Sequence, residues 1–446
     1  MNNTCDLLIQ NCGLLGDDLK LRENCVVAVA EGKIAAAGPA AGNTAWQGKT
    51  TFDAAGKLLL PGFVDGHTHV CQQLLRGRTT DEYPMIWTRF LVPFESSLRP
   101  EDVTVSTRLA CLEMLKAGIT TFADAGGVHM DRAAEAVAES GMRAALCRST
   151  MDTGAAIPAS MKESPEDHLR HTEELYRAYH GSAGGRVAIW FGLRQVMTCS
   201  PRLIRESAEG ARQYRTGLHA HLCEHKDEVS FCLQHYQKRP AAFLDDMGAL
   251  GPNLLTAHNV MLSEGDITLL AKRGVKIIHC PQANFANHGF PKVPRILEAG
   301  LSVGIGNDGA SSVALDMFEQ LRVLKNGTLA YWGLPVFDPL VLPTAALLRM
   351  ASPGGAEALG LGDRLGTISP GREADLILLD LRQPHLYPSQ NPAHTLIACA
   401  SGRDVTDVFI GGKPVMRDRR VLTLDEEKIL ADSARQMAAI VRRADI

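Results

Sequence analysis

The stretch Leu58-Leu59-Leu60-Pro61-Gly62-Phe63-Val64-Asp65-Gly66-His67-Thr68-His69-Val70 decides how the rest of the chain is interpreted. An apolar run meets a Pro-Gly turn signal, and a short segment with strand character follows. Side chains two residues apart point to the same face of a strand, so His67 and His69 project together. Two imidazoles presented in this way are half of a metal site. The other half must come from elsewhere in the chain.

The size and composition of the chain are those of an ordinary globular enzyme. Its 446 residues favour two domains, one of which can be a large barrel, and 45% of them are apolar. A net charge of −4 and an aromatic content of 5% give no reason to expect nucleic acid or an anionic membrane as a partner. No apolar run reaches the roughly 18 residues that a membrane span requires.

The eleven cysteines are scattered, their number is odd, and no Cys-x-x-Cys pair is present. The first residues carry neither the basic segment nor the apolar segment that directs secretion. We therefore expect free thiols, no thiolate zinc ribbon and a cytoplasmic location.

Both ends of the chain carry strand patterns. The predicted strands cover residues 5–12, 25–37 (a hairpin), 50–53, 366–371, 374–380 and 405–410. We expect one composite β-sandwich domain built from residues 1–58 and 362–424. A C-terminal helix over residues 425–446 is expected after an Asp cap, and its basic end suits the helix dipole.

Between the two ends, strands alternate with amphipathic segments of helix length. After the opening stretch, the predicted strands cover residues 118–124, 143–147, 187–193, 217–222, 254–258, 275–279 and 302–305. The predicted helices cover residues 100–117, 131–140, 201–212, 226–237, 263–272, 293–299, 317–326 and 343–358. About eight such units favour an α/β fold with a (β/α)₈ TIM barrel over residues 59–361. A doubly wound sheet is the alternative, but no Gly-x-Gly-x-x-Gly follows an early strand.

Polar residues stand at the ends of several of these strands. They are His67, His69, His221, Glu224, His258, His279 and Asp308. Each alone is more simply explained as a polar core or loop residue. Together they favour one site, because the carboxyl ends of barrel strands converge.

The motifs around these residues resemble the amidohydrolase superfamily. They are Pro61-Gly62-Phe63-Val64-Asp65-Gly66-His67-Thr68-His69, His219-Ala220-His221-Leu222-Cys223-Glu224, Ala257-His258, His279-Cys280-Pro281-Gln282-Ala283-Asn284 and Gly306-Asn307-Asp308-Gly309-Ala310-Ser311-Ser312. They are most similar to its chlorohydrolase and S-adenosylhomocysteine/methylthioadenosine deaminase branch. The resemblance covers nearly the whole chain.

The resemblance implies a mononuclear metal site with His67, His69, His221 and Asp308 as ligands. Three imidazoles and one carboxylate suit Zn²⁺, with Fe²⁺ as the alternative. Such an ion lowers the pKa of a bound water towards about 7. No Lys lies in residues 187–196 to bridge a second ion, which favours one ion per chain.

The resemblance also implies the catalytic roles. Glu224 would protonate the ring nitrogen beside the attacked carbon, and His258 would stabilise charge on the attacking oxygen. Asp308 would accept the proton of the water. We expect His219 to face away from the ligands and to serve packing or support. His279 and Asn284 are expected to shape the substrate pocket.

Two segments depart from the pattern of this branch. Leu193-Arg194-Gln195-Val196-Met197 stands where the branch has a Pro-His-Ala-Pro-Tyr type of sequence, and Phe285-Ala286-Asn287-His288-Gly289-Phe290-Pro291 lacks the usual Lys-Leu-Ala-Ser-Gly. Both fall in substrate-facing loops, so they count against adenosine-type substrates and leave the hydrolytic chemistry intact.

Four further residues are candidates for substrate contact. Arg194 and Gln195 can bind a carboxylate or a carbonyl, since a guanidinium pairs with planar oxygens. The alternative for Arg194 is an outward-facing, solvated side chain. Trp87 can stack on a planar ring or can simply be a packing residue. Arg148, at the end of a predicted strand, is the weakest of the four.

These observations predict a metal-dependent deaminase that releases ammonia from an aminated N-heterocycle of the purine, pterin, pyrimidine or triazine type. Displacement of chloride or alkylamine from a triazine, or opening of a cyclic amide, are the alternatives within hydrolase chemistry. A non-catalytic barrel scaffold is the alternative of another class, but a scaffold needs no converging ligands. We expect a homodimer or higher homo-oligomer, with neither nucleic acid nor membrane as partner.

Overall fold

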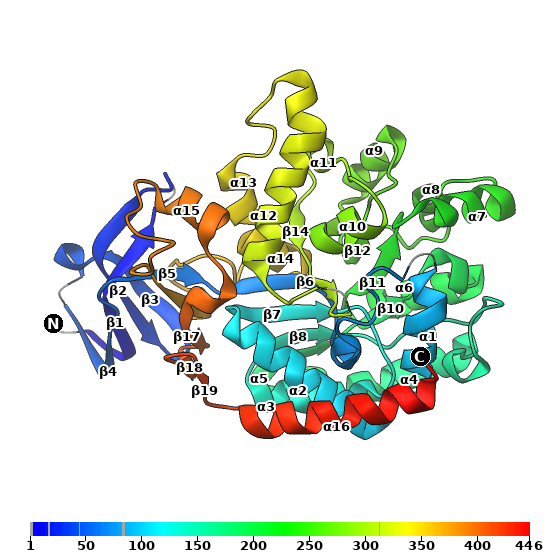
Figure 1. Ribbon diagram of the computed structural model, residues 1–446, viewed down its shortest axis with the longest axis horizontal. Helices are drawn as coiled ribbons and strands as arrows, with labels where there is room; N and C mark the ends of the chain where they lie inside the picture. The colour runs from blue at the N-terminus through cyan, green and yellow to red at the C-terminus, as the bar shows by residue number, and fades with distance from the viewer. Residues whose placement is uncertain (1–2, 17, 44, 83–84, 312) are drawn as a thin grey trace.

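The computed structural model describes residues 3–16, 18–43, 45–82, 85–311 and 313–446. Ser312, the last residue of the motif that begins at Gly306, lies outside the described residues. Figure 1 shows a sheet at one end of the molecule and a larger assembly of strands and helices beside it. No helix in the described part of the chain is long and apolar enough to cross a membrane.

The first and last strands of the chain share one nine-stranded sheet. Its strands are β1 (Asn3–Leu15), β2 (Leu21–Ala30), β3 (Lys33–Pro39), β4 (Trp46–Asp53), β5 (Lys57–Pro61), β16 (Leu376–Asp380), β17 (Val405–Ile410), β18 (Lys413–Arg417) and β19 (Arg420–Val421). Their order is β19-β18-β17-β16-β5-β1-β2-β3, and β4 pairs with β1. The two ends of the chain meet where β5 runs antiparallel to β16, with Leu60 opposite Ile377. A core that includes Ile9, Val27 and Leu376 lies within this part.

One strand expected near the C-terminus is wrong. Residues 366–371 form turns, because Gly366 and Gly371 both have positive φ values of 91° and 87°. Such left-handed backbone breaks a strand. The short helix α15 (Pro392–Cys399) was not expected either, although Asn391 caps it by accepting a hydrogen bond from the His394 amide.

The strands of the middle part form two five-stranded parallel sheets. One has the order β15-β6-β7-β8-β9, with β15 (Asp308–Gly309), β6 (Phe63–His69), β7 (Ile119–Asp124), β8 (Arg143–Leu146) and β9 (Val187–Ile189). The other has the order β10-β11-β12-β13-β14, with β10 (Phe191–Leu193), β11 (Leu218–Leu222), β12 (Leu254–His258), β13 (Lys276–His279) and β14 (Val303–Ile305).

The two parallel sheets continue into each other at two points. Trp190 alone separates β9 from β10; its amide donates to Leu146 O at 2.8 Å, and the Phe191 amide donates to Gly217 O at 3.0 Å. At the other junction, between β14 and β15, the Gly306 amide donates to His279 O at 2.9 Å. A Cβ on Gly306 would lie only 2.8 Å from the backbone of His67, so glycine permits the close approach to β6.

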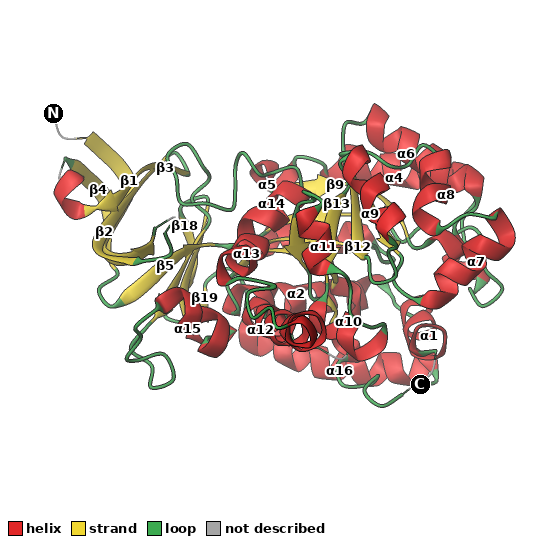
Figure 2. Cartoon of the chain, turned by 90° about the horizontal axis from the view of Figure 1, so that it is seen from above, coloured by secondary structure: helices red, strands yellow, loops and turns green. Residues whose placement is uncertain are grey.

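Helices cover these strands on the outside, as the view from above shows (Figure 2). The longer ones are α2 (Pro100–Lys116), α3 (Met130–Ser140), α4 (Pro165–Tyr179), α6 (Pro201–Gln213), α7 (Lys226–Tyr236), α9 (Glu264–Arg273), α12 (Met317–Thr328) and α16 (Glu426–Ala444). The shorter ones are α1 (Val92–Ser96), α5 (Ser182–Gly185), α8 (Pro240–Asp246), α10 (Pro281–Asn287), α11 (Val293–Glu298), α13 (Thr344–Arg349) and α14 (Gly355–Ala358). The six expected helices between residues 100 and 299 have the predicted bounds to within one residue.

Helix α4 was missed although its start signal is in the sequence. Ser164 accepts a hydrogen bond from the Asp167 amide, and Pro165 is the first helical residue. The same Ser-Pro start occurs at Ser200, which caps the correctly predicted α6. The C-terminal helix α16 lies along α2 and is tied to it by an ion pair between Lys116 Nζ and Glu426 Oε1 at 2.5 Å.

Candidate active site

Four side chains that the sequence marked as metal ligands come together at the strand ends. His67 and His69 lie on β6, His221 lies on β11, and Asp308 begins β15. Asp308 Oδ1 is 3.7 Å from His67 Nε2 and 3.6 Å from His69 Nε2, and the Nε2 atoms of His69 and His221 are 3.3 Å apart. Ligand atoms at tetrahedral zinc are about 3.4 Å apart, given bonds of about 2.0–2.1 Å. These separations fit a single ion.

The nitrogen atoms of these imidazoles also fit a metal. His67 Nε2 is buried and has no hydrogen-bond partner among the described residues. The other nitrogen of the ring, Nδ1, lies 2.9 Å from His219 Nε2, so the ring orientation is fixed. Burial lowers the pKa of His67, His69 and His221 and so favours the neutral rings that a metal binds.

His219 points inward, which corrects the expectation that it faces away. Residues two apart share a face of a strand, so His219 and His221 lie on the same side of β11. His219 lies one step earlier along the strand and contacts His67 instead of the other ligand atoms. It therefore supports a ligand, as expected, but from the interior.

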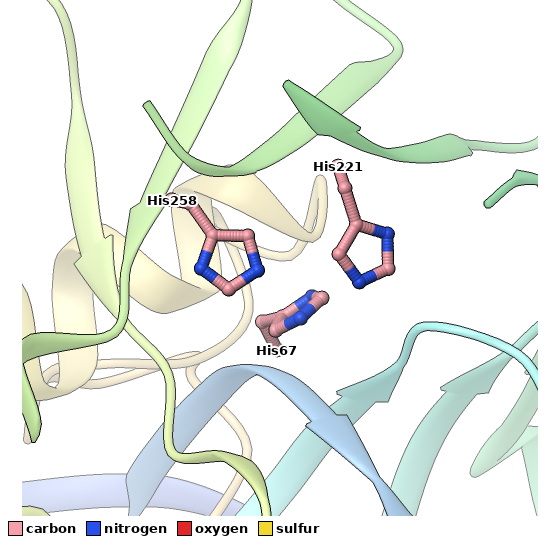
Figure 3. Close-up of side chains that lie close together, drawn as sticks. All are labelled: His67, His221 and His258. Atoms are coloured by element: carbon pink, nitrogen blue, oxygen red, sulfur yellow. The ribbon is translucent and has the colours of Figure 1, made fainter. Parts of the chain in front are cut away.

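His258 closes the cluster from a fourth strand, β12. Figure 3 shows the rings of His67, His221 and His258 facing one another, and one nitrogen of each lies within 4.8 Å of the others. The buried His258 Nε2 has no hydrogen-bond partner in the described part of the chain and is 3.9 Å from Glu224 Oε1. This nitrogen therefore faces the cluster and is open to a ligand.

The orientation of His258 is set by two residues behind it. Its Nδ1 donates to Asn284 Oδ1 at 2.9 Å, and Asn284 Nδ2 donates to His279 Nδ1 at 2.6 Å. Because an amide oxygen only accepts, His258 carries its proton on Nδ1. His279 and Asn284 thus hold His258, and neither lines the substrate cavity.

Backbone strain marks the same strand ends. Cys223, His258 and Asp308 have positive φ values of 52°, 73° and 67°. Left-handed backbone is uncommon for residues other than glycine and is often found at functional sites. The turns that follow these strands are therefore shaped to aim the polar side chains.

Glu224 has a partner that sequence reasoning missed. Its Oε1 is 3.1 Å from Nε2 of His288, and the His288 ring stacks on His225 with a centroid distance of 5.6 Å. Burial lowers the pKa of His288, but the contact with Glu224 outweighs this effect and raises it. The only signal in the sequence was that His288 lies in the segment that departs from the family pattern.

A cavity of about 820 Å³ opens onto this cluster. Its lining includes His69, His221, Glu224, His288 and Asp308, and also Gln72, Trp87, Arg194, Gln195 and Met197. Of the six residues expected to contact substrate, Trp87, Arg194 and Gln195 thus line the cavity. Arg148 does not; it pairs with Glu163, with 2.5 Å between Nη2 and Oε1.

Arg194 is buried in the cavity wall rather than solvated. Its two terminal nitrogens each lie 3.2 Å from one oxygen of Glu95, and only 4% and 1% of these two side chains are exposed. Gln72 donates to the same carboxylate at 2.6 Å. The guanidinium group lies 5.9 Å from the centre of the Trp87 ring. Glu95 was not among the candidate residues, because it lies 99 residues from Arg194 in the chain and no local pattern marks it.

Known proteins match this chain over almost its full length. A 5-methylthioadenosine/S-adenosylhomocysteine deaminase from Desulforudis audaxviator is 40% identical, over 93% of this chain and 94% of the relative. A 5'-deoxyadenosine deaminase from Methanosarcina mazei is 35% identical over 99% of both chains. The crystal structure of an adenosine deaminase from Xanthomonas campestris with bound zinc superposes with a TM-score of 0.91 at 31% identity, covering 99% of this chain and 100% of the other.

The sequence model of the amidohydrolase family matches residues 58–415. This match begins at the Leu58–Val70 stretch and ends in the terminal sheet. The α/β fold is therefore of the TIM-barrel type found in that family, and the chain is a member of the amidohydrolase family, as its motifs predicted.

Proposed function

We propose that this protein is a metal-dependent hydrolytic deaminase that releases ammonia from an aminated N-heterocycle. The coarser class is confirmed: the family match and the deaminase relatives make it a hydrolase acting on carbon–nitrogen bonds other than peptide bonds. The observation that carries the proposal is the position of Glu224. Its carboxylate lies 3.9 Å from His258 Nε2 and lines the same cavity as His69, His221 and Asp308, which are three of the proposed metal ligands.

The proposed cofactor is one divalent ion per chain, Zn²⁺ rather than Fe²⁺, held by His67, His69, His221 and Asp308. The donor set and the separations of 3.3–3.7 Å between donor atoms support it. The zinc in the related adenosine deaminase structure supports the choice of metal. When bound, such an ion activates a water molecule for attack on carbon.

The proposed catalytic residues handle the protons of the reaction. Water adds to the amino-bearing carbon, and the C–N bond to the amino group then breaks to give a carbonyl and ammonia. Asp308 takes a proton from the water and passes it to the departing amino group. Glu224 delivers a proton to the adjacent ring nitrogen and regains one from the added hydroxyl group as the carbonyl forms. His258, held by Asn284 through Nδ1, stabilises the charge on the incoming oxygen when its Nε2 also carries a proton.

His288 is proposed to position Glu224. Its imidazole contacts Glu224 Oε1 at 3.1 Å and stacks on His225, so the carboxylate is held at the cavity wall before substrate binds. Preorganised geometry of this kind lowers the cost of proton transfer.

Two lines of argument bear on the substrate. The relatives act on adenosine-type substrates, which weighs against our expectation from the 193–197 and 285–291 departures. The cavity wall is nevertheless particular, because Arg194 is paired with Glu95 beside Trp87. We propose that Trp87 stacks on the heterocycle and that Arg194 and Gln195 contact an oxygen-bearing group of the substrate. Adenine nucleosides are therefore the first compounds to test.

The test is an ammonia-release assay with zinc-loaded protein. The panel holds 5'-methylthioadenosine, S-adenosylhomocysteine and 5'-deoxyadenosine, followed by aminated purines, pterins, pyrimidines and triazines. We expect stoichiometric ammonia and the corresponding oxo product from at least one compound. If chloride or alkylamine is released without ammonia, the enzyme displaces a different leaving group and is not a deaminase. If protein that carries one ion per chain is inactive on every compound of the panel, the proposed deaminase function is wrong.

We also propose that the two parallel sheets form one closed eight-stranded barrel over residues 59–361, with residues 1–58 and 362–424 as a separate sandwich domain. The junctions at Trp190 and at Gly306 support closure, because the chain passes there directly from β9 to β10 and from β14 to β15, so that each pair counts as one barrel strand. Trp190 is hydrogen-bonded to β8 of one sheet, and the Asn307 amide donates to Asp65 on β6. The pairing of β5 with β16 supports the composite domain. Ten of the eleven cysteines are buried, and all are free thiols, which supports a reducing compartment such as the cytoplasm.

A homo-oligomer is proposed from an apolar tip beyond α12. This tip exposes Tyr331, Leu334, Val336, Phe337 and Leu340. Phe337 is 95% exposed, and a contiguous apolar surface of this kind commonly marks a protein contact. Light scattering on the Val336→Ser/Phe337→Ser variant should show a smaller species than the wild type. An unchanged oligomer would mean that the subunits meet elsewhere, and a monomeric wild type would contradict the proposal.

A further inference from the structure

A second cavity lies at the other ends of the parallel strands. Its volume is about 600 Å³ and it shares no lining residue with the cavity of the candidate active site. Arg143 is the first residue of β8, Arg186 precedes β9, and Gly217 precedes β11. In a parallel sheet the amino ends of the strands lie at the edge opposite to the carboxyl ends. This cavity is therefore separate from the histidine cluster.

Every lining side chain with a fixed charge is an arginine. They are Arg143, Arg186, Arg212, Arg215 and Arg364. No Asp or Glu lines the cavity within the described part of the chain. Two carboxylates lie just outside: Asp375 pairs with Arg143 at 2.7 Å, and Glu373 pairs with Arg364 at 2.9 Å. The cavity therefore keeps an excess of positive charge.

The remaining three arginines have no carboxylate partner. Arg212 Nη1 donates to the carbonyl of Gly248 at 2.7 Å. The side chains of Arg186 and Arg215 make no ion pair or hydrogen bond with residues that the structure describes. Arg186 Nε is buried without a partner, and both burial and the charge of Arg143 lower the pKa of Arg186. A buried N–H group without an acceptor is unfavourable unless a ligand supplies one.

Apolar side chains also line the cavity. Trp190, between β9 and β10, is one of them, together with Leu359, Leu361 and Leu365. The backbone of Gly217 lies directly against the indole, since a Cβ there would be 2.2 Å from ring atoms. Guanidinium donors and an aromatic ring in one cavity suit a ligand with an anionic group and a flat organic part.

We propose that this cavity binds a phosphorylated small molecule, with its phosphate held by Arg186, Arg212 and Arg215 and its organic part against Trp190. A guanidinium group can pair two N–H donors with two phosphate oxygens. A phosphate would also supply the negative charge that a carboxylate partner would otherwise give these three arginines. The volume lies in the range of about 300–1,000 Å³ that is usual for small-molecule sites and exceeds the size of a lone phosphate. This site takes no part in the proposed deamination, so its test is independent of the test of the deaminase function.

Isothermal calorimetry on the full-length protein at low ionic strength tests the site. The probes are inorganic pyrophosphate and UMP, whose base has no exocyclic amino group to release. We expect both to bind, and UMP to bind more tightly because its base contacts Trp190. If pyrophosphate binds as tightly as UMP, the ligand is an inorganic anion and the organic half of the proposal fails.

The variant Arg186→Gln/Arg215→Gln removes two unpaired charges and should weaken both probes at least tenfold. The matched control is Arg170→Gln/Arg177→Gln, which removes two exposed arginines from α4 and should leave the affinities unchanged. Circular dichroism checks folding, and the single Arg215→Gln variant, at an exposed position, serves if the double variant unfolds. Unchanged affinities in a folded variant, or no binding by the wild type at about 10 mM probe, would overturn the proposal.

Discussion

The two ends of the parallel strands carry opposite chemistry on one scaffold. At the carboxyl ends, imidazoles and carboxylates present lone pairs towards a common centre. At the amino ends, guanidinium groups present only N–H donors. The five-residue strand β11 takes part in both, with Gly217 before its start and His221 near its end. A single short strand therefore separates the proposed cation site from the proposed anion site.

The position of a residue along its strand decides which chemical groups it presents at each end of the sheet. His67 and His258 each use one ring nitrogen for a neighbour behind them, so the second nitrogen faces the centre. Arg186 has no such neighbour, and its buried Nε is left without a partner. The carboxyl ends are thus preorganised by the protein, whereas the amino ends lack an acceptor that a ligand would supply.

The largest effect is expected from removing the cation at the carboxyl ends. The variant Asp308→Ala should lose about 10⁴-fold or more in kcat, because several kcal/mol of transition-state stabilisation disappear with the metal. Elemental analysis should find about one ion per wild-type chain and much less in the variant. The control His394→Ala removes an exposed histidine and should retain both metal and activity. An active, metal-free Asp308→Ala protein would contradict the ligand set.

Next in size is the loss of the proton carrier. Glu224→Gln should lower kcat by roughly 10²–10⁴-fold, since the amide cannot carry the proton, while metal content stays at the wild-type level. Glu174→Gln, an exposed acid on α4, is the matched control. If Glu224→Gln keeps wild-type kcat, the ring nitrogen is protonated by another group and the deaminase mechanism needs a different acid.

A smaller effect should come from His288, which only positions Glu224. His288→Ala should lower kcat about tenfold with little change in KM, because the carboxylate is then less well aimed. His288→Gln restores an N–H donor near the position of Nε2 and should recover most of the loss. Steady-state kinetics on both variants decide the matter: equal defects in Ala and Gln would show that the hydrogen bond is not the relevant contact.

The cavity wall should affect KM more than kcat. The paired change Arg194→Met/Glu95→Gln removes both charges together, so no buried carboxylate is left unpaired. We expect KM to rise about tenfold while kcat and metal content stay close to wild type, since a hydrogen bond to a charged group is worth about 1.5–3 kcal/mol at most. A change in kcat with constant KM would place Arg194 near the reacting atoms instead.

The smallest effect is expected at the amino ends. Arg215→Gln should leave kcat and KM for ammonia release within about twofold of wild type, because the two cavities share no lining residue. The same kinetic assay with added pyrophosphate sharpens the comparison. If Arg215→Gln alters turnover without any added anion, the two ends of the strands are coupled and are not independent sites.

Much of the framework could be predicted because its signals are local. The His-x-His spacing on β6, the Ser-Pro helix start at Ser200 and the strand–helix alternation are all properties of a few neighbouring residues. The errors arose where local signals were overlooked or misapplied. Helix α4 follows the same start signal at Ser164 but was missed, and the side of β11 given to His219 ignored the two-residue repeat.

The partners of the active-site residues could not be predicted, because they depend on contacts between distant segments. Glu95 pairs with Arg194 across 99 residues, and His288 reaches Glu224 from a loop with no recognisable pattern. The sequence was compatible with either a solvated or an inward-facing Arg194 side chain. In the structure this side chain is buried.

The sequence by itself determined the chemistry of this protein: the residue types and spacings of His67, His69, His221 and Asp308 already indicated a metal-binding hydrolase. Only the tertiary structure decided how those residues are supported and what else faces the cavities. The physical reason is that the chemical nature of a metal-binding group depends only on the type of a single residue. Orientation, burial and charge balance arise only when strands and loops far apart in the chain are packed together.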